Sequence, residues 1–406
     1  MKTQITFTED TAGVTDAKGF YASAASGDIR RKGDGRLDTG IVYSPTPCAS
    51  AGVFTKNKVK AAPVLQCVHV LDTSESIHGI VANSGNANAC TGEQGKIDAA
   101  SMADLAANAC AVPPESFFAC STGRIGELLP MSSLKEAIIA SGTAAKAGSQ
   151  DGDAFANCIL TSDTRKKSCT ATFEIEGNTV AVAGIAKGAG MIQPNMATML
   201  AFVTTDIAAE STALQPLLKE AVQKTFNAIT VDGDMSTNDT VLILANGQSG
   251  VALDDASMAL FQEALYKVCD SLADKIVADG ECITKVVELL VSGGASEQDA
   301  ENVARAIGNS LLVKTSWYGN DPNWGRLMDA LGYADAAFDP EQIDVSYGDI
   351  PALVSGTPVP ENKPKWKEVV AATRFTIRID LKQGPFAYRL RASDLSEGYV
   401  DFNKSE

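Results

Sequence analysis

The chain alternates between two periodicities of hydrophobic and polar positions. Runs rich in β-branched and aromatic residues predict strands, and apolar residues spaced three or four apart predict helices. Strands are predicted at residues 40–43, 64–71, 77–82, 116–120, 199–205, 241–245 and 283–291, as a hairpin at 169–186 and as a closing β pair at 375–381 and 386–391. Helices are predicted at residues 96–110, 132–140, 212–226, 256–277 and 297–312. This alternation predicts an α/β fold, and the hairpins favour mixed sheets with helices in the outer layers.

The composition is that of a globular chain with a large excess of negative charge. Its 406 residues include 50 acidic and 34 basic side chains, for a formal net charge of −16. Nucleic acids and anionic membranes attract basic surfaces, so we expect neither as a partner. No apolar run reaches the roughly 18 residues of a membrane span, and the first residues lack the apolar core of a signal peptide. Nine cysteines stand singly without a CxxC pair, which disfavours zinc clusters and disulfide frameworks and predicts a cytoplasmic location.

The chain lacks the residues that several common kinds of catalysis require. The chain has two histidines, His69 and His78, in apolar stretches typical of structural histidines, and it has no GxSxG elbow. HExxH, P-loop and complete GxGxxG motifs are also missing, so no metal or nucleotide cofactor is expected. Asp232, Asp234 and Asp239 form an acidic cluster that could bind a cation, although such residues more often cap turns and helices.

The segment from Lys187 to Leu200, KGAGMIQPNMATML, combines tight backbone turns with a hydroxyl residue at the start of a strand. Two glycines permit close backbone approach, and the proline fixes its own φ. A hydroxyl held against the preceding carbonyl can attack it, and hydrolysis of the resulting ester leaves a new N-terminal Thr198. Its free α-amino group, with a reference pKa of about 7.7–8.0, can serve as the base for its own hydroxyl. The alternative is that Thr198 is an ordinary β-former.

Five stretches, in order and spread over nearly the whole chain, resemble the ornithine acetyltransferase (glutamate N-acetyltransferase) family of arginine biosynthesis. They are the segment just described, NSGNANACTG at 83–92, CSTGRIGELLP at 120–130, TVDGDMSTNDT at 230–240 and DPNWGRLMDALGYA at 321–334. The resemblance implies a layered mixed-sheet sandwich with helices outside, similar to N-terminal-nucleophile enzymes, with a smaller C-terminal α/β portion.

The resemblance also implies self-cleavage between Ala197 and Thr198. The products would be an α piece, residues 1–197, and a β piece, residues 198–406, which share one core and assemble as α2β2. Thr198 would be the acetyl-accepting nucleophile and also a substrate contact. The oxyanion pair of the family falls on Thr122 and Gly123, and a Thr hydroxyl with nearby backbone N–H groups suits that role.

Four further residues match substrate contacts of the family. Thr161 stands in CILTSDT, where TTDT is expected, and Lys187 can pair with a substrate carboxylate. The carboxylate of Glu281 suits the side-chain amine of ornithine, although Cys282 stands where the family usually has Gly. Asn403 matches the C-terminal motif, and what replaces a Ser or Thr that the family has beyond Glu406 is left open.

The predicted function is a ping-pong transfer of acetyl from N2-acetyl-L-ornithine to L-glutamate through acetyl-Thr198, without a cofactor. Some members of the family also take acetyl from acetyl-CoA, and the sequence carries no independent CoA signature that decides the point. Two alternatives stay open. One is an N-terminal-nucleophile amidase or aminopeptidase that sends water to the same acyl-enzyme, and the other is a non-catalytic relative.

Overall fold

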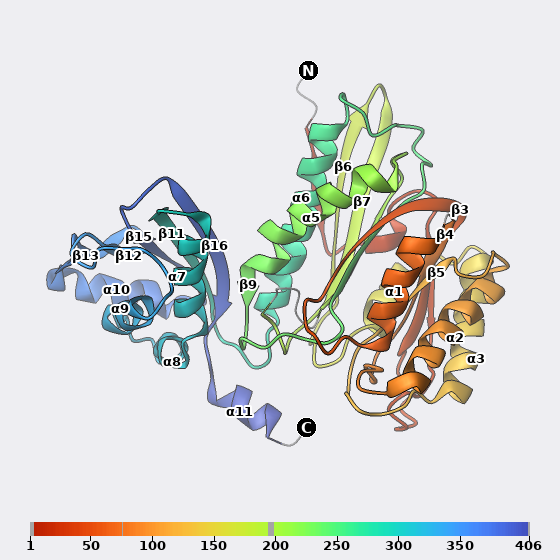
Figure 1. Cartoon of the computed structure of the whole chain (residues 1–406), viewed down its shortest axis with the longest axis horizontal. Helices are drawn as coiled ribbons and strands as arrows, with labels where there is room; N and C mark the ends of the chain where they lie inside the picture. Colours follow the sequence, from red (N-terminus) through yellow and green to blue (C-terminus); the bar gives the residue numbers. More distant parts are fainter. Residues whose placement is uncertain (1–3, 75, 194–198, 405–406) are drawn as a thin grey trace. The chain divides into compact units, whose positions relative to one another are not determined.

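The computed structural model describes residues 4–74, 76–193 and 199–404, which form two compact units (Figure 1). Unit 1 contains Met1–Gly188, Pro194–Asn227 and Asp234–Ile276, and unit 2 contains Ala189–Gln193, Ala228–Gly233 and Val277–Glu406. This division differs from the predicted α and β pieces, because unit 1 takes residues from both sides of position 197. The chain crosses between the units several times.

Within the described residues, unit 1 is built on one mixed sheet of nine strands in the order β1-β6-β7-β8-β10-β3-β4-β5, with β2 paired to β3. Neighbouring strands are antiparallel except for the parallel pairs β8–β10 and β4–β5. The strands are β1 (Thr6–Glu9), β2 (Tyr21–Ala25), β3 (Thr39–Phe54), β4 (Ile77–Asn83), β5 (Phe117–Ser121), β6 (Lys167–Ile175), β7 (Asn178–Lys187), β8 (Leu200–Thr205) and β10 (Thr240–Ala245).

The 16-residue strand β3 joins two halves of this sheet. Its first part pairs with β2 and β4, its last part pairs with β10, and the register shifts between Tyr43 and Cys48. Both halves contribute to one buried core, in which Ile80 and Phe118 of one half are clustered with Phe202 of the other. The sheet therefore folds into a sandwich, as the sequence predicts.

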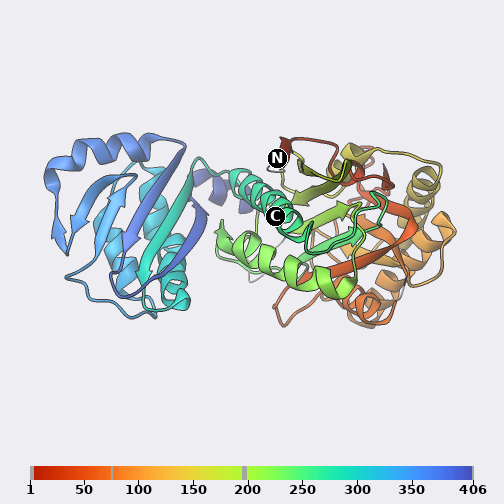
Figure 2. The same ribbon diagram turned by 90° about the horizontal axis from the view of Figure 1, so that it is seen from above.

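Helices cover the outer faces of the sandwich (Figures 1 and 2). Side chains alternate along a strand, so Val81 and Phe117 point away from the central core and pack against Met102 and Leu134 of the helices. On the other half, Val268 and Leu272 approach Gly184 of β7 closely. The helices of unit 1 are α1 (Ala62–Thr73), α2 (Gly92–Cys110), α3 (Met131–Lys146), α4 (Gly152–Cys158), α5 (Ser211–Lys224) and α6 (Met258–Ala278), with short 3-10 turns at Gly13–Thr15 and Phe226–Ala228.

The strand predicted at residues 64–71 is wrong, because this stretch lies in helix α1. Pro63 occupies the first turn, where its fixed φ suits a helix and its missing N–H has no cost. Val64, Cys67 and Val70 recur at intervals of three and are buried, so tertiary packing overrides the β propensity of the valines.

Unit 2 is a seven-stranded sheet within the described residues, in the order β14-β13-β12-β15-β11-β16-β9. Val287 and Leu289 on one face of the sheet pack against Val303, Ile307 and Trp317 of the helices. The strands are β9 (Ile229–Thr230), β11 (Val286–Gly294), β12 (Asp344–Tyr347), β13 (Ile350–Val354), β14 (Thr357–Pro358), β15 (Arg374–Asp380) and β16 (Phe386–Ser393). The helices are α7 (Glu297–Asn309), α8 (Leu311–Tyr318), α9 (Trp324–Gly332), α10 (Lys363–Ala371) and α11 (Glu397–Asn403), with a 3-10 turn at Pro360–Asn362. This is the predicted smaller C-terminal α/β portion.

The predicted closing pair at 375–381 and 386–391 is wrong in its pairing. Both segments are strands, but β15 lies parallel to β11 on one side and β16 antiparallel to it on the other. The connection passes over the end of β11, where the N–H groups of Gln383 and Gly384 donate to Gly293 O. These hydrogen bonds give the Gly293 carbonyl, at the end of β11, its partners. They also fix the connection so that β15 and β16 lie on opposite sides of β11.

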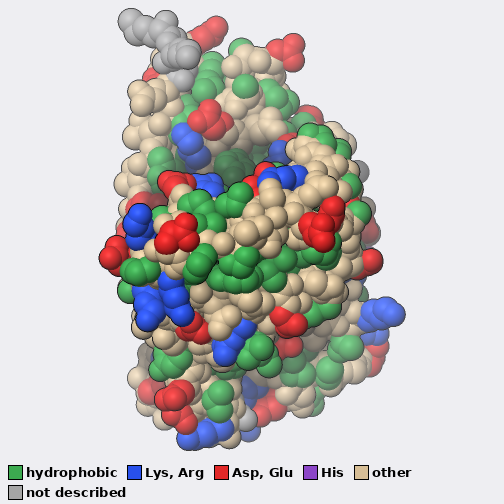
Figure 3. Space-filling model, turned by 90° about the vertical axis from the view of Figure 1, so that its left-hand side faces the viewer, with side chains coloured by type: hydrophobic (Ala, Val, Ile, Leu, Met, Phe, Trp, Pro, Cys, Tyr) green, Lys and Arg blue, Asp and Glu red, His purple; other side chains and the backbone are tan. Residues whose placement is uncertain are grey.

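The surface of unit 2 that faces the viewer in Figure 3 mixes acidic, basic and hydrophobic side chains. Across the described part of the chain, every helix is too short or too polar to cross a bilayer.

We expect Gly79→Ala to destabilise the protein by about 1–3 kcal/mol, because overpacking a filled core forces its neighbours to shift. A Cβ at this position would lie 2.1 Å from Val42 O and 2.5 Å from the ring of Phe117. Gly332→Ala is the matched control, since no atom lies within 4 Å of its added Cβ. Urea unfolding of both variants checks this, and equal midpoints would contradict the packing described for β4.

Candidate active site

The predicted cleavage residues Ala197 and Thr198 lie outside the described residues, but the strands on both sides are well defined. Strand β7 ends at Lys187 and β8 begins at Leu200, and these two residues are direct partners in the sheet. Leu200 also pairs with Thr240, and Thr240 pairs with Phe54. The ends of four strands therefore meet at one edge of the sheet, immediately next to the predicted nucleophile in sequence.

Thr122 and Gly123, the predicted oxyanion pair, form the turn that follows β5. Thr122 is 1% exposed, and its Oγ1 has no hydrogen-bond partner within the described part of the chain. A buried hydroxyl without a partner is costly, so it is typical of a group that meets a ligand. Gly123 has φ +133°, and a Cβ there would lie 2.3 Å from Gly85 C. Only glycine fits this turn.

Asparagine side chains hold this turn in place. Ser121 Oγ donates to Asn83 Oδ1 at 2.6 Å, and Asn83 Nδ2 donates to Asn86 O at 3.0 Å. Asn86 Nδ2 in turn donates to the carbonyl of Glu127 at 3.1 Å. Amides of this kind replace missing backbone partners in a loop, so the NSGNANACTG stretch holds the CSTGRIGELLP stretch in place.

The structure brings the predicted substrate contacts Lys187 and Thr161 together. Lys187 is 1% exposed, and its Nζ donates to Thr161 Oγ1 at 2.7 Å. A buried ammonium next to a hydroxyl can receive a carboxylate, which is the role that the sequence predicts for Lys187.

Asp163 is a charged partner of this pair that the sequence analysis missed. Its carboxylate accepts from Lys167 Nζ and from Gly188 N–H, both at 2.6 Å, and it lies 3.5 Å from Lys187 Nζ. Burial by itself would raise its pKa, but the ammonium groups of Lys187 and Lys167 and these hydrogen bonds hold the pKa of Asp163 well below its usual value. The sequence signal that could have identified Asp163 is its place two residues after Thr161, in the stretch TSDT.

Glu281 and Asn403, the predicted contacts in unit 2, are also joined. Asn403 Nδ2 donates to Glu281 Oε2 at 3.0 Å, and Glu281 N–H donates to Ala189 O at 3.0 Å. A Cβ on Gly190 would lie 2.3 Å from Glu281 Oε1, so the glycine segment passes directly against the carboxylate. Cys282 has φ +53°, which costs a side-chain residue roughly 1–2 kcal/mol and explains a preference for Gly there.

The acidic cluster of the sequence is divided between the two units. The carboxylate of Asp232 accepts the N–H groups of Met191 and Ile192 at 2.7 and 2.8 Å, so it caps a turn of unit 2. Asp239 belongs to unit 1 and accepts the N–H of Met199 at 3.0 Å. Among the described residues, no three His, Cys, Asp or Glu side chains are arranged to hold a metal ion.

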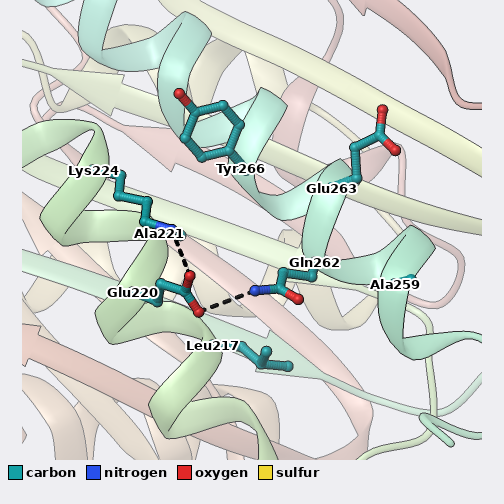
Figure 4. Close-up of a pocket in the computed structure, with 8 residues that line it drawn as sticks. All are labelled: Leu217, Glu220, Ala221, Lys224, Ala259, Gln262, Glu263 and Tyr266. Atoms are coloured by element: carbon teal, nitrogen blue, oxygen red, sulfur yellow. Dashed lines mark hydrogen bonds and ion pairs between the residues drawn. The ribbon is translucent and has the colours of Figure 1, made fainter. Parts of the chain in front are cut away.

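A groove of about 510 Å³ lies between α5 and α6, but none of the predicted site residues lines it (Figure 4). Glu220 accepts hydrogen bonds from both Lys224 and Gln262 across its floor. The Glu220 carboxylate is therefore already paired on both oxygens, and we do not place the chemistry in this groove. Its lining residues are Leu217, Glu220, Ala221, Lys224, Ala259, Gln262, Glu263 and Tyr266.

Two named relatives resemble this chain over nearly its full length, and a solved structure matches half of it. A relative from Symbiobacterium thermophilum, the arginine biosynthesis bifunctional protein ArgJ, is 46% identical over 397 residues, which is 97% of this chain and 98% of the relative. The glutamate N-acetyltransferase of Methanocaldococcus jannaschii is 43% identical over 404 residues, covering 96% and 97% of the two chains. A crystal structure of ArgJ from Bacillus halodurans is 37% identical and covers 50% of this chain and 98% of that chain, with a TM-score of 0.49.

These relatives and the mixed α/β fold define an acyltransferase. The chain belongs to the ArgJ family, whose model matches residues 21–405. This confirms the resemblance that the five sequence stretches carry.

Replacing Asp163 with Asn should lower the free energy of unfolding by about 3–5 kcal/mol, because two buried lysines lose their shared carboxylate. The exposed pair of Glu220 with Lys224 is the control, and Glu220→Gln should cost less than about 1 kcal/mol. The pKa of Asp163 is lowered in the folded state, so its stabilisation is present above pH about 3.9 and declines below it. Thermal unfolding at pH 7 and pH 3 measures both effects, and a variant gap that widens at pH 3 would contradict this reading.

Proposed function

We propose that this chain is a self-processing glutamate N-acetyltransferase of arginine biosynthesis, which moves acetyl from N2-acetyl-L-ornithine to L-glutamate. The names of its near-full-length relatives support this activity. The structural observation that carries the proposal is the buried Thr122 hydroxyl, which lacks a partner in the described residues and stands beside a turn that only Gly123 fits. Such a donor is suited to the oxyanion of an acyl-transfer step.

Processing begins when Thr198 Oγ attacks the carbonyl carbon of Ala197. The C–N bond breaks, the nitrogen of Thr198 takes up the proton of the hydroxyl, and an ester joins the two pieces. Water hydrolyses this ester, which leaves a carboxylate on Ala197 and a free amino group on Thr198. The α-amine can then act as the base that histidine supplies in other enzymes.

Transfer then proceeds through two acyl exchanges. Thr198 Oγ attacks the acetyl carbonyl of N2-acetyl-ornithine, its α-amine takes the proton, and Thr122 with Gly123 stabilises the oxyanion. The α-amine returns the proton to the departing ornithine nitrogen, which leaves acetyl-Thr198. The amine of glutamate attacks this ester, releases N-acetylglutamate and restores the hydroxyl.

Charged side chains account for amino-acid substrates. Lys187 can pair with a substrate carboxylate, and its contact with Thr161 supports a shared role. Glu281, joined to Asn403, offers a carboxylate for the side-chain amine of ornithine. An acetyl donor without the side-chain amine of ornithine would leave Glu281 without a cation. Glu281 would therefore select the donor by its charge.

Several finer points belong to the same proposal. No cofactor is required by these steps, and we propose acetyl-CoA as a second donor, as for some members of the family. The α and β pieces are proposed to assemble as α2β2 in the cytoplasm.

The antiparallel pairing of β7 with β8 supports an association of the two pieces after cleavage, because these strands come from opposite sides of position 197. An amidase would share the acyl-enzyme but would act without glutamate.

Purified protein should resolve into fragments of 197 and 209 residues by mass spectrometry, with Thr at the new N-terminus. Thr198→Ala should remain full length, because it lacks the attacking hydroxyl. The wild-type fragments should elute together on gel filtration. A wild-type chain that stays intact on prolonged incubation, or fragments that separate, would refute these expectations.

Acetyl exchange between ornithine and glutamate tests the transfer and the role of Glu281 together. Glu281→Gln should raise KM for N2-acetyl-ornithine about tenfold or more, since a charge-assisted hydrogen bond contributes roughly 1.5–3 kcal/mol. Its self-cleavage should be normal, because cleavage involves no ornithine. The exposed carboxylate of Glu361 in the same unit gives the control variant Glu361→Gln. An unchanged KM would remove Glu281 from the site, and acetyl-ornithine hydrolysis indifferent to glutamate would favour the amidase.

A further inference from the structure

Two consecutive residues, Asn238 and Asp239, contact both parts of the predicted apparatus in unit 1. They lie directly before strand β10, and they are 4% and 0% exposed. Neither takes part in the steps proposed above, so their burial and their contacts call for another explanation.

Asn238 holds the turn that carries the oxyanion donors. Its Nδ2 donates to Ser121 O at 2.8 Å and to Ala87 O at 2.6 Å, so both amide hydrogens are used. Ser121 is the residue immediately before Thr122. Thr237 Oγ1 donates to Asn238 Oδ1 at 2.6 Å, and this fixes the orientation of the amide.

Asp239 holds the start of strand β8. Its Oδ1 accepts the N–H of Met199 at 3.0 Å, and its backbone carbonyl accepts the N–H of Thr55 at 3.0 Å. Met199 is the residue immediately after the predicted nucleophile. Within the described residues, Oδ2 has no hydrogen-bond partner.

The environment of Asp239 favours an uncharged side chain. Burial raises its pKa well above the usual value, although the Met199 N–H, the nearby hydroxyls and the charge of Lys187 act in the opposite direction. Oδ1 is the atom that accepts the Met199 N–H, so an amide of the same shape can keep this hydrogen bond.

Building on the proposed function, we propose that Asn238 and Asp239 are positioning residues that set the spacing between the oxyanion turn and the start of strand β8. Their Cα atoms are joined by one peptide, about 3.8 Å apart. Two hydrogen-bonded side chains on this short unit therefore link Ser121 and Met199, which flank the two reacting groups in sequence. A displacement of about 1 Å between such groups can reduce a rate about 100-fold.

The test compares four variants of the full chain in self-cleavage, in kcat and KM for acetyl exchange, and in thermal unfolding. Asp239→Ala removes the acceptor, Asp239→Asn keeps it, and Asn238→Asp removes both donors. The matched control is Asp206→Ala at the opposite end of β8. Asp206 is also buried, and its carboxylate accepts the N–H groups of Ala181 at 2.9 Å and Lys18 at 3.1 Å.

We expect Asp239→Ala and Asn238→Asp to slow cleavage and to lower kcat at least tenfold, with KM changed less than threefold. Asp239→Asn should keep at least a third of the wild-type kcat. Asp206→Ala should lower the melting temperature about as much as Asp239→Ala but should cleave and turn over normally.

Four outcomes would overturn the inference. They are normal kcat in Asp239→Ala, normal kcat in Asn238→Asp, a loss in Asp239→Asn equal to that in Asp239→Ala, and a similar loss in the Asp206 control. A wild-type chain that neither cleaves nor exchanges acetyl would instead refute the proposed function, so the two failures are distinguishable.

Discussion

Burial of charge at the end of strand β7 constrains the candidate site more than any other interaction. Asp163 has no exposed side-chain surface, and it shares its carboxylate between Lys167 and Lys187. Buried ions are tolerated only when their geometry and hydrogen bonds are complete, so this cluster fixes the loop at 161–163 against the end of β7. Lys187 pairs with Leu200, the first residue of β8, so the position of Lys187 determines where β8 begins. Leu200 follows the predicted nucleophile, Thr198, by two residues in the sequence.

Much of the fold could be predicted because local pattern and final environment agree. The hairpin around Glu176-Gly177-Asn178 is an example, since Gly177 has φ +83° and the flanking residues pair in register. The stretch 64–71 could not be assigned, because its valines fit a strand locally and only burial against β5 selects the helix. A single helix predicted at 297–312 is two helices, because Ser310 leaves the helical region and accepts the N–H of Val313 to begin α8.

Prediction of the site was limited in the same way, because contacts between distant residues cannot be read from the sequence. The residues that resemble family motifs were found, and the contacts of Lys187 with Thr161 and of Glu281 with Asn403 agree with their grouping. Asp163 and Asn238 were not singled out, because their roles depend on partners far away in the sequence. Asp239 was grouped with Asp232 by proximity along the chain, yet the two belong to different units. The spacing of residues in the sequence reveals which of them are unusual, but only the fold shows which atoms they contact.

The pairing of β7 with β8 has a consequence for how the protein folds. In the intact chain these strands are joined by a short connection, so their pairing is a local event with little loop entropy to overcome. Once the connection is cut as proposed, the same pairing becomes an association of two polypeptides, and its free energy depends on concentration. Once unfolded, the mature protein would refold slowly at low concentration, because its two pieces must first meet. Its persistence would rest on a high unfolding barrier, acquired during a first folding as a single chain.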